Sequence, residues 1–219
     1  MQYYTYIAEL LALIACVLLF GSLRKSILKW FLLLLVVTNI VEWGNHFKLF
    51  TIVYSNGMRS NNWIINLLNI FEFVFYGLIY KAIITNKKDK KRITVFLAVL
   101  LVAILLNILF VQGMFYFDSY TFILGACYLV YCSALFFKQQ IQHIDNQNIF
   151  SQSFFWISLG LLFFCSGQAI LVSFFQYFLY IKNFKSFLPV WRFFNNFLNI
   201  ILYASLIIAF LCSRKQYTI

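Results

Sequence analysis

The feature that most constrains this chain is a succession of seven apolar stretches, each long enough for a membrane-spanning helix, separated by short polar segments. A helix needs about 20 apolar residues to cross the ~30 Å hydrocarbon core of a bilayer. Hydrophobic residues make up 63% of the 219 residues and charged residues 11%, whereas soluble domains average about 45–50% and about 25%. We therefore predict an all-α polytopic membrane protein, with residues 1–219 forming one seven-helix transmembrane domain. The predicted spans are residues 3–22, 28–47, 63–84, 93–112, 119–137, 153–180 and 190–212.

Basic residues are distributed unevenly between the predicted loops. If the helices alternate in direction, twelve of the 17 Lys and Arg residues fall on one side, with the densest run at residues 86–92, Asn-Lys-Lys-Asp-Lys-Lys-Arg. Because cytoplasmic loops carry the excess of Lys and Arg, we predict an N-terminus outside and a C-terminus in the cytoplasm. The net charge of +11 is then explained by the membrane flanks, and we expect no nucleic-acid partner. A lipid-headgroup or partner-docking patch is an alternative use of the run.

Two parts of the chain resemble each other. Residues 66–70, Asn-Leu-Leu-Asn-Ile, match residues 196–200, Asn-Phe-Leu-Asn-Ile, and residues 4–7 match residues 120–123. Two interpretations stay open. One is a 3+1+3 parallel repeat, as in some transporters, with the fourth helix as a lipid-facing linker. The other is chance similarity between segments rich in Phe, Leu and Asn.

The six acidic residues fall into two groups. Asp89, Asp118 and Asp145 lie in predicted loops, and Glu9, Glu42 and Glu72 lie inside predicted helices. A charge at the bilayer centre costs at least about 2.5 kcal/mol, so such residues usually face a cavity or a partner. Glu72 falls near the midplane. We expect it to be protonated at neutral pH unless a cation or ligand is bound, and to bond an Asn or Tyr of the second or seventh helix.

Polar side chains form stripes along the second, third, sixth and seventh predicted helices, mostly in their outer halves, while the inner halves are apolar. Such stripes predict an outward-facing polar and acidic pocket. The alternatives are Asn residues that join helices, at about 0.6 kcal/mol per hydrogen bond, and Glu residues that are neutral or paired with Arg192 or His46. The predicted ligand-binding residues are Asn39, Glu42, Asn66, Asn69, Glu72, Gln168, Asn196, Asn199 and Tyr203.

Catalytic and metal-binding chemistry is not expected. His46 and His143 fall on opposite sides of the membrane, whereas zinc sites gather several His, Cys or carboxylate ligands. The five Cys lie in apolar segments without a Cys-x-x-Cys motif, and no serine has a nearby histidine or a Gly-x-Ser-x-Gly context. We predict a non-enzymatic protein with no catalytic residue, metal or cofactor.

Three segments carry a resemblance to a known family: residues 69–76 (Asn-Ile-Phe-Glu-Phe-Val-Phe-Tyr), residues 158–168 and residues 195–203. Together they resemble a family of uncharacterised bacterial seven-helix membrane proteins. The resemblance implies a multi-pass protein of the bacterial cytoplasmic (inner) membrane, with a sensor kinase as a membrane partner. The topology is also similar to that of SWEET-type sugar carriers, but those rely on prolines in the repeated helices, and Pro189 is the only proline here.

Three functions are compatible with these features. The first is a receptor-like sensor that binds a small polar or cationic ligand and signals to a membrane partner. The second is a small-solute carrier with SWEET-like topology, proton-coupled through Glu42 or Glu72. The third is a structural subunit of a membrane complex.

Overall fold

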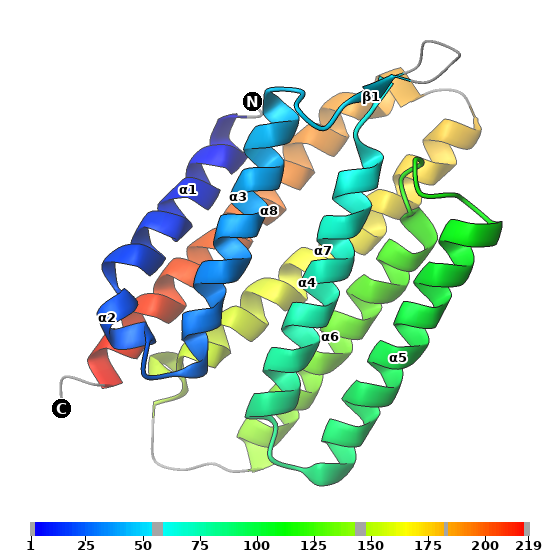
Figure 1. The fold of residues 1–219 in the computed structure, drawn as a ribbon. Helices are drawn as coiled ribbons and strands as arrows, with labels where there is room; N and C mark the ends of the chain where they lie inside the picture. The colour runs from blue at the N-terminus through cyan, green and yellow to red at the C-terminus, as the bar shows by residue number, and fades with distance from the viewer. Residues whose placement is uncertain (1–2, 54–58, 143–147, 182–183, 217–219) are drawn as a thin grey trace.

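The computed structural model describes residues 3–53, 59–142, 148–181 and 184–216, and these residues are almost entirely helical. The long elements run alternately up and down through the molecule (Figure 1). The helices are α1 (Tyr3–Leu18), α2 (Phe20–Leu23), α3 (Phe31–His46), α4 (Asn62–Ile83), α5 (Lys87–Phe110), α6 (Ser119–Gln142), α7 (Ser153–Tyr180) and α8 (Phe184–Gln216). Short 3₁₀ turns at Ile27–Trp30 and Ile149–Ser151 and a two-stranded ribbon of β1 (Ile52–Val53) and β2 (Arg59–Ser60) complete the fold.

Six helices in the described part of the chain are long and apolar enough to cross a membrane, and α1 is a shorter apolar helix. The predicted polytopic helical bundle is confirmed at this level, while seven spans and their orientation stay predictions. The predicted first span at residues 3–22 is interrupted, because α1 ends at Leu18 and α2 follows as a separate turn. The last helix begins at Phe184 and continues through Pro189, where residue 190 was predicted as its start. Long apolar helices tolerate a proline when neighbouring helices support them.

Six helices form a ring in which each contacts the next, in the order α1, α3, α4, α6, α7 and α8, with α8 closing against α1. Helix α5 lies outside this ring, against α4 and α6 (Figure 1). Only 22% of the most apolar window of α5 is buried, compared with 44–50% for the other long helices. Helix α5 is thus the least buried of the long helices, and the lipid-facing role of residues 93–112 stays a prediction.

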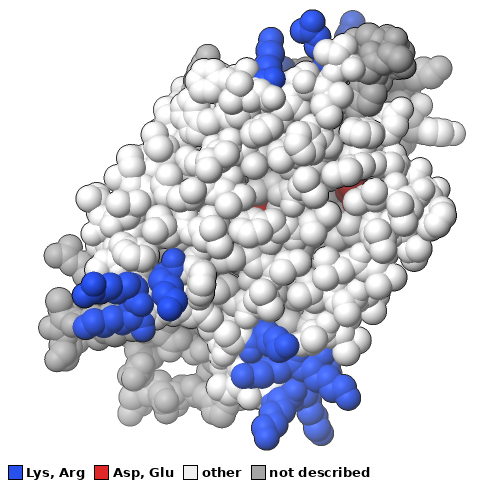
Figure 2. Space-filling view, viewed as in Figure 1, with Lys and Arg blue, Asp and Glu red and all other residues white. Residues whose placement is uncertain are grey.

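The two ends of the bundle differ in charge. We call the end with the β-ribbon and the start of α1 the hairpin end, and the opposite end, where Lys and Arg side chains cluster, the basic end (Figure 2). The basic run is not a loop, as the sequence suggested, but the first two turns of α5. Asn86 caps this helix by accepting a hydrogen bond from Lys88 N at 2.9 Å, an arrangement that favours helix initiation. Asp145 and His143 lie outside the described residues.

Large side chains fill the half of the ring nearer the basic end. Phe31, Tyr80 and Phe210 are each at most 1% exposed, and the Phe31 and Phe210 rings lie 6.1 Å apart. The hydroxyl of Tyr80, on α4, lies 2.8 Å from Ser133 Oγ of α6 and donates to Ser158 Oγ of α7 at 3.0 Å. Three helices are thereby joined inside an apolar core.

Candidate functional site

The other half of the ring, toward the hairpin end, contains a cavity of about 430 Å³. Its wall extends from Tyr6 and Asn62, in the first turns of α1 and α4, down to Glu72 and Tyr203 in the middle of α4 and α8. Small-molecule sites have volumes of about 300–1,000 Å³. The cavity is therefore large enough for a small organic ligand. The side chains of its wall determine which kind of ligand fits.

Three glutamates from three helices line the cavity: Glu9 of α1, Glu42 of α3 and Glu72 of α4. They are close enough to interact electrostatically with one another. Glu9 is 0% exposed, and neither of its carboxyl oxygens has a hydrogen-bond partner among the described residues. In Figure 2, acidic atoms show only as small patches near the middle of the face. The three cavity glutamates are thus separate from Asp89, which lies at the basic end beside Arg92 and Lys138.

Basic side chains are missing from the described residues that line the cavity: none is Lys, Arg or His. Arg192, a pairing partner considered from the sequence, is exposed on α8. A buried unpaired carboxylate is strongly unfavourable, and the group must either hold a proton or receive a cation. The described cavity wall therefore offers a bound molecule acidic but no basic side chains.

Hydrogen bonds between amide and hydroxyl side chains connect α8 to its neighbours in the cavity wall. Thr5 Oγ1 donates to Asn196 Oδ1 at 2.7 Å, which joins α1 to α8. Gln168 Nε2 donates to Asn195 Oδ1 at 2.7 Å, which joins α7 to α8. Asn199 Nδ2 donates to the carbonyl of Asn195 at 2.8 Å, within its own helix. These bonds fix the polar wall opposite α3 and α4.

Aromatic rings make up much of the remaining wall. Trp191 lies 5.0 Å from Phe175 between ring centroids, and Phe175 lies 6.2 Å from Phe117. Tyr6 and Tyr203 line the cavity from α1 and α8. The faces of Trp, Tyr and Phe attract cations by about 0.5–2 kcal/mol each when water is excluded. Rings and carboxylates together favour a cationic organic group.

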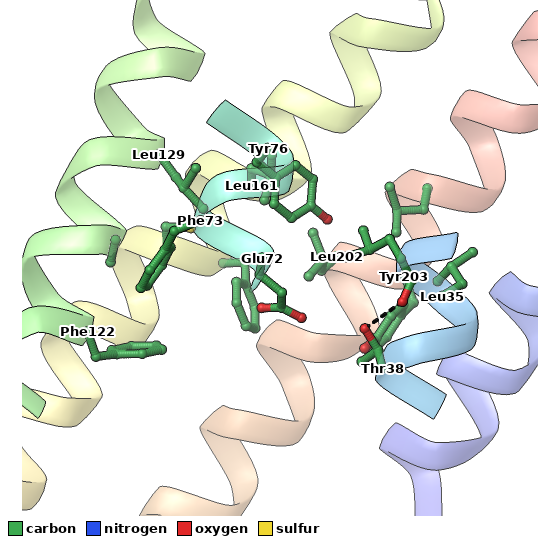
Figure 3. Close-up of a pocket in the computed structure, with 15 residues that line it drawn as sticks. Leu35, Thr38, Glu72, Phe73, Tyr76, Phe122, Leu129, Leu161, Leu202 and Tyr203 are labelled. Atoms are coloured by element: carbon green, nitrogen blue, oxygen red, sulfur yellow. Dashed lines mark hydrogen bonds between the residues drawn. The ribbon is translucent and has the colours of Figure 1, made fainter. Parts of the chain in front are cut away.

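Glu72 lies at the floor of the cavity, because it also borders a second space of about 30 Å³ on the side of the basic end (Figure 3). That space is the size of one water molecule and is lined mainly by apolar groups such as Leu161 and Leu202. The polar residues that border this space with Glu72 are Thr38, Tyr76 and Tyr203. A hydrogen bond from Glu72 to an Asn or Tyr of the second or seventh predicted helix stays a prediction. Thr38 Oγ1 donates to Leu34 O at 2.9 Å, within α3.

The structure brings seven of the nine predicted residues to the cavity wall, namely Glu42, Asn69, Glu72, Gln168, Asn196, Asn199 and Tyr203. Their binding of a ligand stays a prediction. Asn39 and Asn66 are not among the lining residues. Asn39 Nδ2 donates to Leu35 O within α3 at 2.8 Å. Helical spacing alone could not separate these two positions from their neighbours.

Asn66 has a structural role that its sequence context did not show. Its Nδ2 donates to the carbonyls of Met114 and Tyr116 at 3.0 and 2.8 Å, and its Oδ1 accepts from Asp118 N at 3.1 Å. Asp118 also bonds Asn107 of α5. This network holds the α5–α6 connection over the ring and places Phe117 in the cavity wall.

Sequence reasoning grouped Glu9 with Glu42 and Glu72 as acids that face a cavity, but did not include Glu9 among the predicted binding residues and missed Thr5 and Tyr6 of α1. Glu9 was detectable by the rule applied to Glu42, because both are acids inside apolar helices. Trp191 and Phe117 carried no signal, since aromatic residues occur throughout this chain. Comparisons of the chain with protein-family models, with curated proteins and with solved structures give no match, so its function has to be inferred from the chemistry of this cavity.

Proposed function

We propose that this chain is a receptor-like membrane sensor that binds a small organic cation in the cavity and passes the resulting helix shift to a membrane partner. The observation that carries the proposal is the set of three inward-facing carboxyls in a cavity whose described wall contains no basic side chain. A cationic ligand supplies the countercharge that the described residues of the cavity wall lack. No catalytic step is assigned to the site.

The distribution of the carboxyls favours an organic cation. Glu9, Glu42 and Glu72 approach from three helices, and within the described ranges no three potential metal ligands come together. An ammonium group with apolar substituents can contact a carboxylate and the aromatic faces of Tyr6 and Trp191 at the same time. The amides of α8 then orient the polar part of the ligand.

The packed half below Glu72 supports a sensor in preference to a carrier. The space beyond Glu72 holds about one water molecule, and the side chains next in line, such as Tyr80 and Leu206, are at most 1% exposed. A ligand that enters this cavity therefore meets a closed core. We propose the hairpin end as the outer face and the basic end as the cytoplasmic face, in keeping with the Lys and Arg excess.

Helix α4 offers a physical connection between the cavity and the basic end. Glu72, Tyr76 and Tyr80 follow at intervals of four residues and so share one face of the helix. A ligand that moves Glu72 displaces Tyr80 against Ser133 and Ser158, which bond its hydroxyl. The partner that reads this shift is proposed to be a sensor kinase, as the sequence resemblance implies. Tyr80→Phe should leave ligand affinity within about twofold but weaken the response of a co-expressed kinase, and an unchanged response would remove Tyr80 from the relay.

A titration with two ligands of the same shape tests the site. The purified chain in lipid nanodiscs is titrated by calorimetry with choline and with 3,3-dimethylbutan-1-ol, its uncharged carbon analogue. We expect choline to bind at least about tenfold more tightly, which corresponds to ~1.4 kcal/mol. Equal affinities, or binding of the neutral analogue alone, would show that the carboxyls do not recognise a cation.

A carrier is the second candidate, and the order of helices in the ring is the observation that favours it. The first triplet, α1, α3 and α4, faces the second triplet, α6, α7 and α8, with α5 outside, an order compatible with a 3+1+3 parallel repeat. Counterflow of labelled choline in proteoliposomes distinguishes the two functions. Exchange above that of empty liposomes supports the carrier, and binding without exchange supports the sensor. If the chain binds nothing and is stable only in a larger complex, the structural-subunit alternative stands.

A further inference from the structure

A second recess lies on the outside of the ring at the basic end. It is an open groove of about 570 Å³ between α5 and α6, and it shares no lining residue with the cavity. Its wall consists of Lys88, Lys91, Arg92, Val95, Phe96, Val99 and Tyr131. The function proposed for the cavity does not involve this groove.

Basic side chains line one part of the groove. Lys88, Lys91 and Arg92 follow at spacings of three and four residues, so they share one face of α5, and all three are exposed. They belong to the basic cluster around the start of α5 (Figure 2). Asp89 is buried beside them, with Arg92 Nη1 at 3.0 Å and Lys138 Nζ, from α6, at 3.6 Å. The groove therefore has a net positive charge, and Lys88 and Lys91 lie outside the Asp89 ion pairs.

The same face of α5 turns apolar toward the middle of the molecule. Val95 and Val99 lie seven and eleven residues beyond Lys88, roughly 10 and 16 Å along the axis, and are 53% and 56% exposed. Phe96 and Tyr131, whose rings lie 5.8 Å apart, form the wall where α5 meets α6. A molecule in this groove meets positive charge at one end and hydrocarbon along the rest.

We propose that the groove binds one anionic phospholipid, with its phosphate among Lys88, Lys91 and Arg92 and an acyl chain along Val95 and Val99. Charge complementarity selects the headgroup, since a basic residue near the membrane surface attracts anionic lipid. The apolar continuation selects a lipid over free phosphate, because only a lipid buries hydrocarbon against Val99. The position of α5 outside the ring leaves this face available to the bilayer.

Lipid retention measured by native mass spectrometry tests the site on the full chain, with phosphatidylglycerol and phosphatidylcholine as competing probes. We expect wild-type protein to retain phosphatidylglycerol at least about tenfold over phosphatidylcholine. The double variant Lys88→Gln/Lys91→Gln should lose most of this preference. The matched control, Arg24→Gln/Lys25→Gln, removes the same charge at the basic end outside the groove and should retain it. An equal loss in both variants would reduce the effect to general surface charge and overturn the proposal.

Two further experiments test whether an acyl chain lies in the apolar part of the groove and whether the bound phosphate belongs to a lipid. Val99→Trp fills the apolar part while keeping all three cations, and we expect it to reduce phosphatidylglycerol retention at least about fivefold. Unchanged retention in Val99→Trp would overturn the assignment of the acyl chain. Inorganic phosphate should not displace the lipid, and displacement at millimolar concentration would identify a free-phosphate site instead. A wild-type chain with no preference between the two lipids would refute the proposal outright.

Discussion

Buried acids at the two ends of the bundle have different surroundings. At the basic end, Asp89 lies within 3.0 Å of Arg92 and 3.6 Å of Lys138. In the cavity, Glu9 is more deeply buried, yet its carboxyl oxygens have no hydrogen-bond partner in the described part of the chain. The chain has 17 Lys and Arg residues, so a shortage of basic residues does not explain the difference. Under the proposed function, a cationic ligand supplies the countercharge in the cavity.

The packing of the interior also differs between the two halves of the bundle. Around Tyr80 the helices pack through large side chains and one fully bonded hydroxyl, whereas around Glu72 they enclose a polar space. The packed core near the basic end would hold the bundle together while a ligand in the cavity moves the helices around it. Four predictions test this contrast.

The largest effect is expected from overpacking where α7 crosses α8. A Cβ added at Gly160 would lie 2.6 Å from Ser205 Cβ, so Gly160→Leu forces two helices apart at a cost of about 3 kcal/mol. We expect little folded protein, seen as a lower melting temperature and aggregation in size-exclusion chromatography. Gly21→Leu is the control, because nothing lies within 4 Å of that position. A Gly160→Leu protein as stable as Gly21→Leu would show that this contact is not tight.

A fixed positive charge in the cavity should abolish binding of a cationic ligand. Asn199→Lys places an ammonium group among the three carboxyls, and like charges in one site cost several kcal/mol. We expect choline affinity to fall by about 100-fold or more while the melting temperature stays or rises. Asn199→Gln serves as the neutral control in the same calorimetric titration. If Asn199→Lys binds choline normally, the ligand does not occupy the acidic cavity.

Removal of the charge at the cavity floor should have an intermediate effect. Glu72→Gln keeps the size and shape of the side chain but cannot ionise, and we expect a loss of roughly tenfold to 100-fold in choline affinity. The protein should insert and fold normally, as judged by its melting temperature. Intact binding in Glu72→Gln, combined with destabilisation in Glu72→Leu, would make Glu72 a structural residue.

The smallest effects are expected from neutralising one buried acid at each end of the bundle, and these two substitutions should change the free energy of unfolding in opposite directions. Asp89→Asn loses ion pairs with two half-exposed cations and should lower the free energy of unfolding by about 1 kcal/mol or less. Glu9→Gln removes an acid that lacks a partner and should leave stability unchanged or raise it. Thermal melts of both variants, without ligand, provide the comparison. The same sign and size for both would mean that the two acids are equivalent.

The sequence was sufficient to predict helices that consist of long apolar runs. It was insufficient to predict which side chains line the cavity, because that depends on tertiary contacts. Helix α7 has the predicted bounds of 153–180, because polar residues flank a continuous apolar stretch. Asn66 and Asn69 looked alike in the sequence, but Asn66 holds the α5–α6 connection while Asn69 lines the cavity. The role of α1 depended on how α1 meets α8. A one-dimensional pattern does not contain that contact.

Trp191 in the cavity wall gives the protein a built-in optical reporter. Of the five tryptophans in the chain, Trp191 alone is among the residues that line the cavity. Indole emission responds to a nearby charge and to the exclusion of water. Occupancy should therefore be readable from a change in intrinsic fluorescence that disappears in Trp191→Phe, without any label attached to the ligand or to the protein.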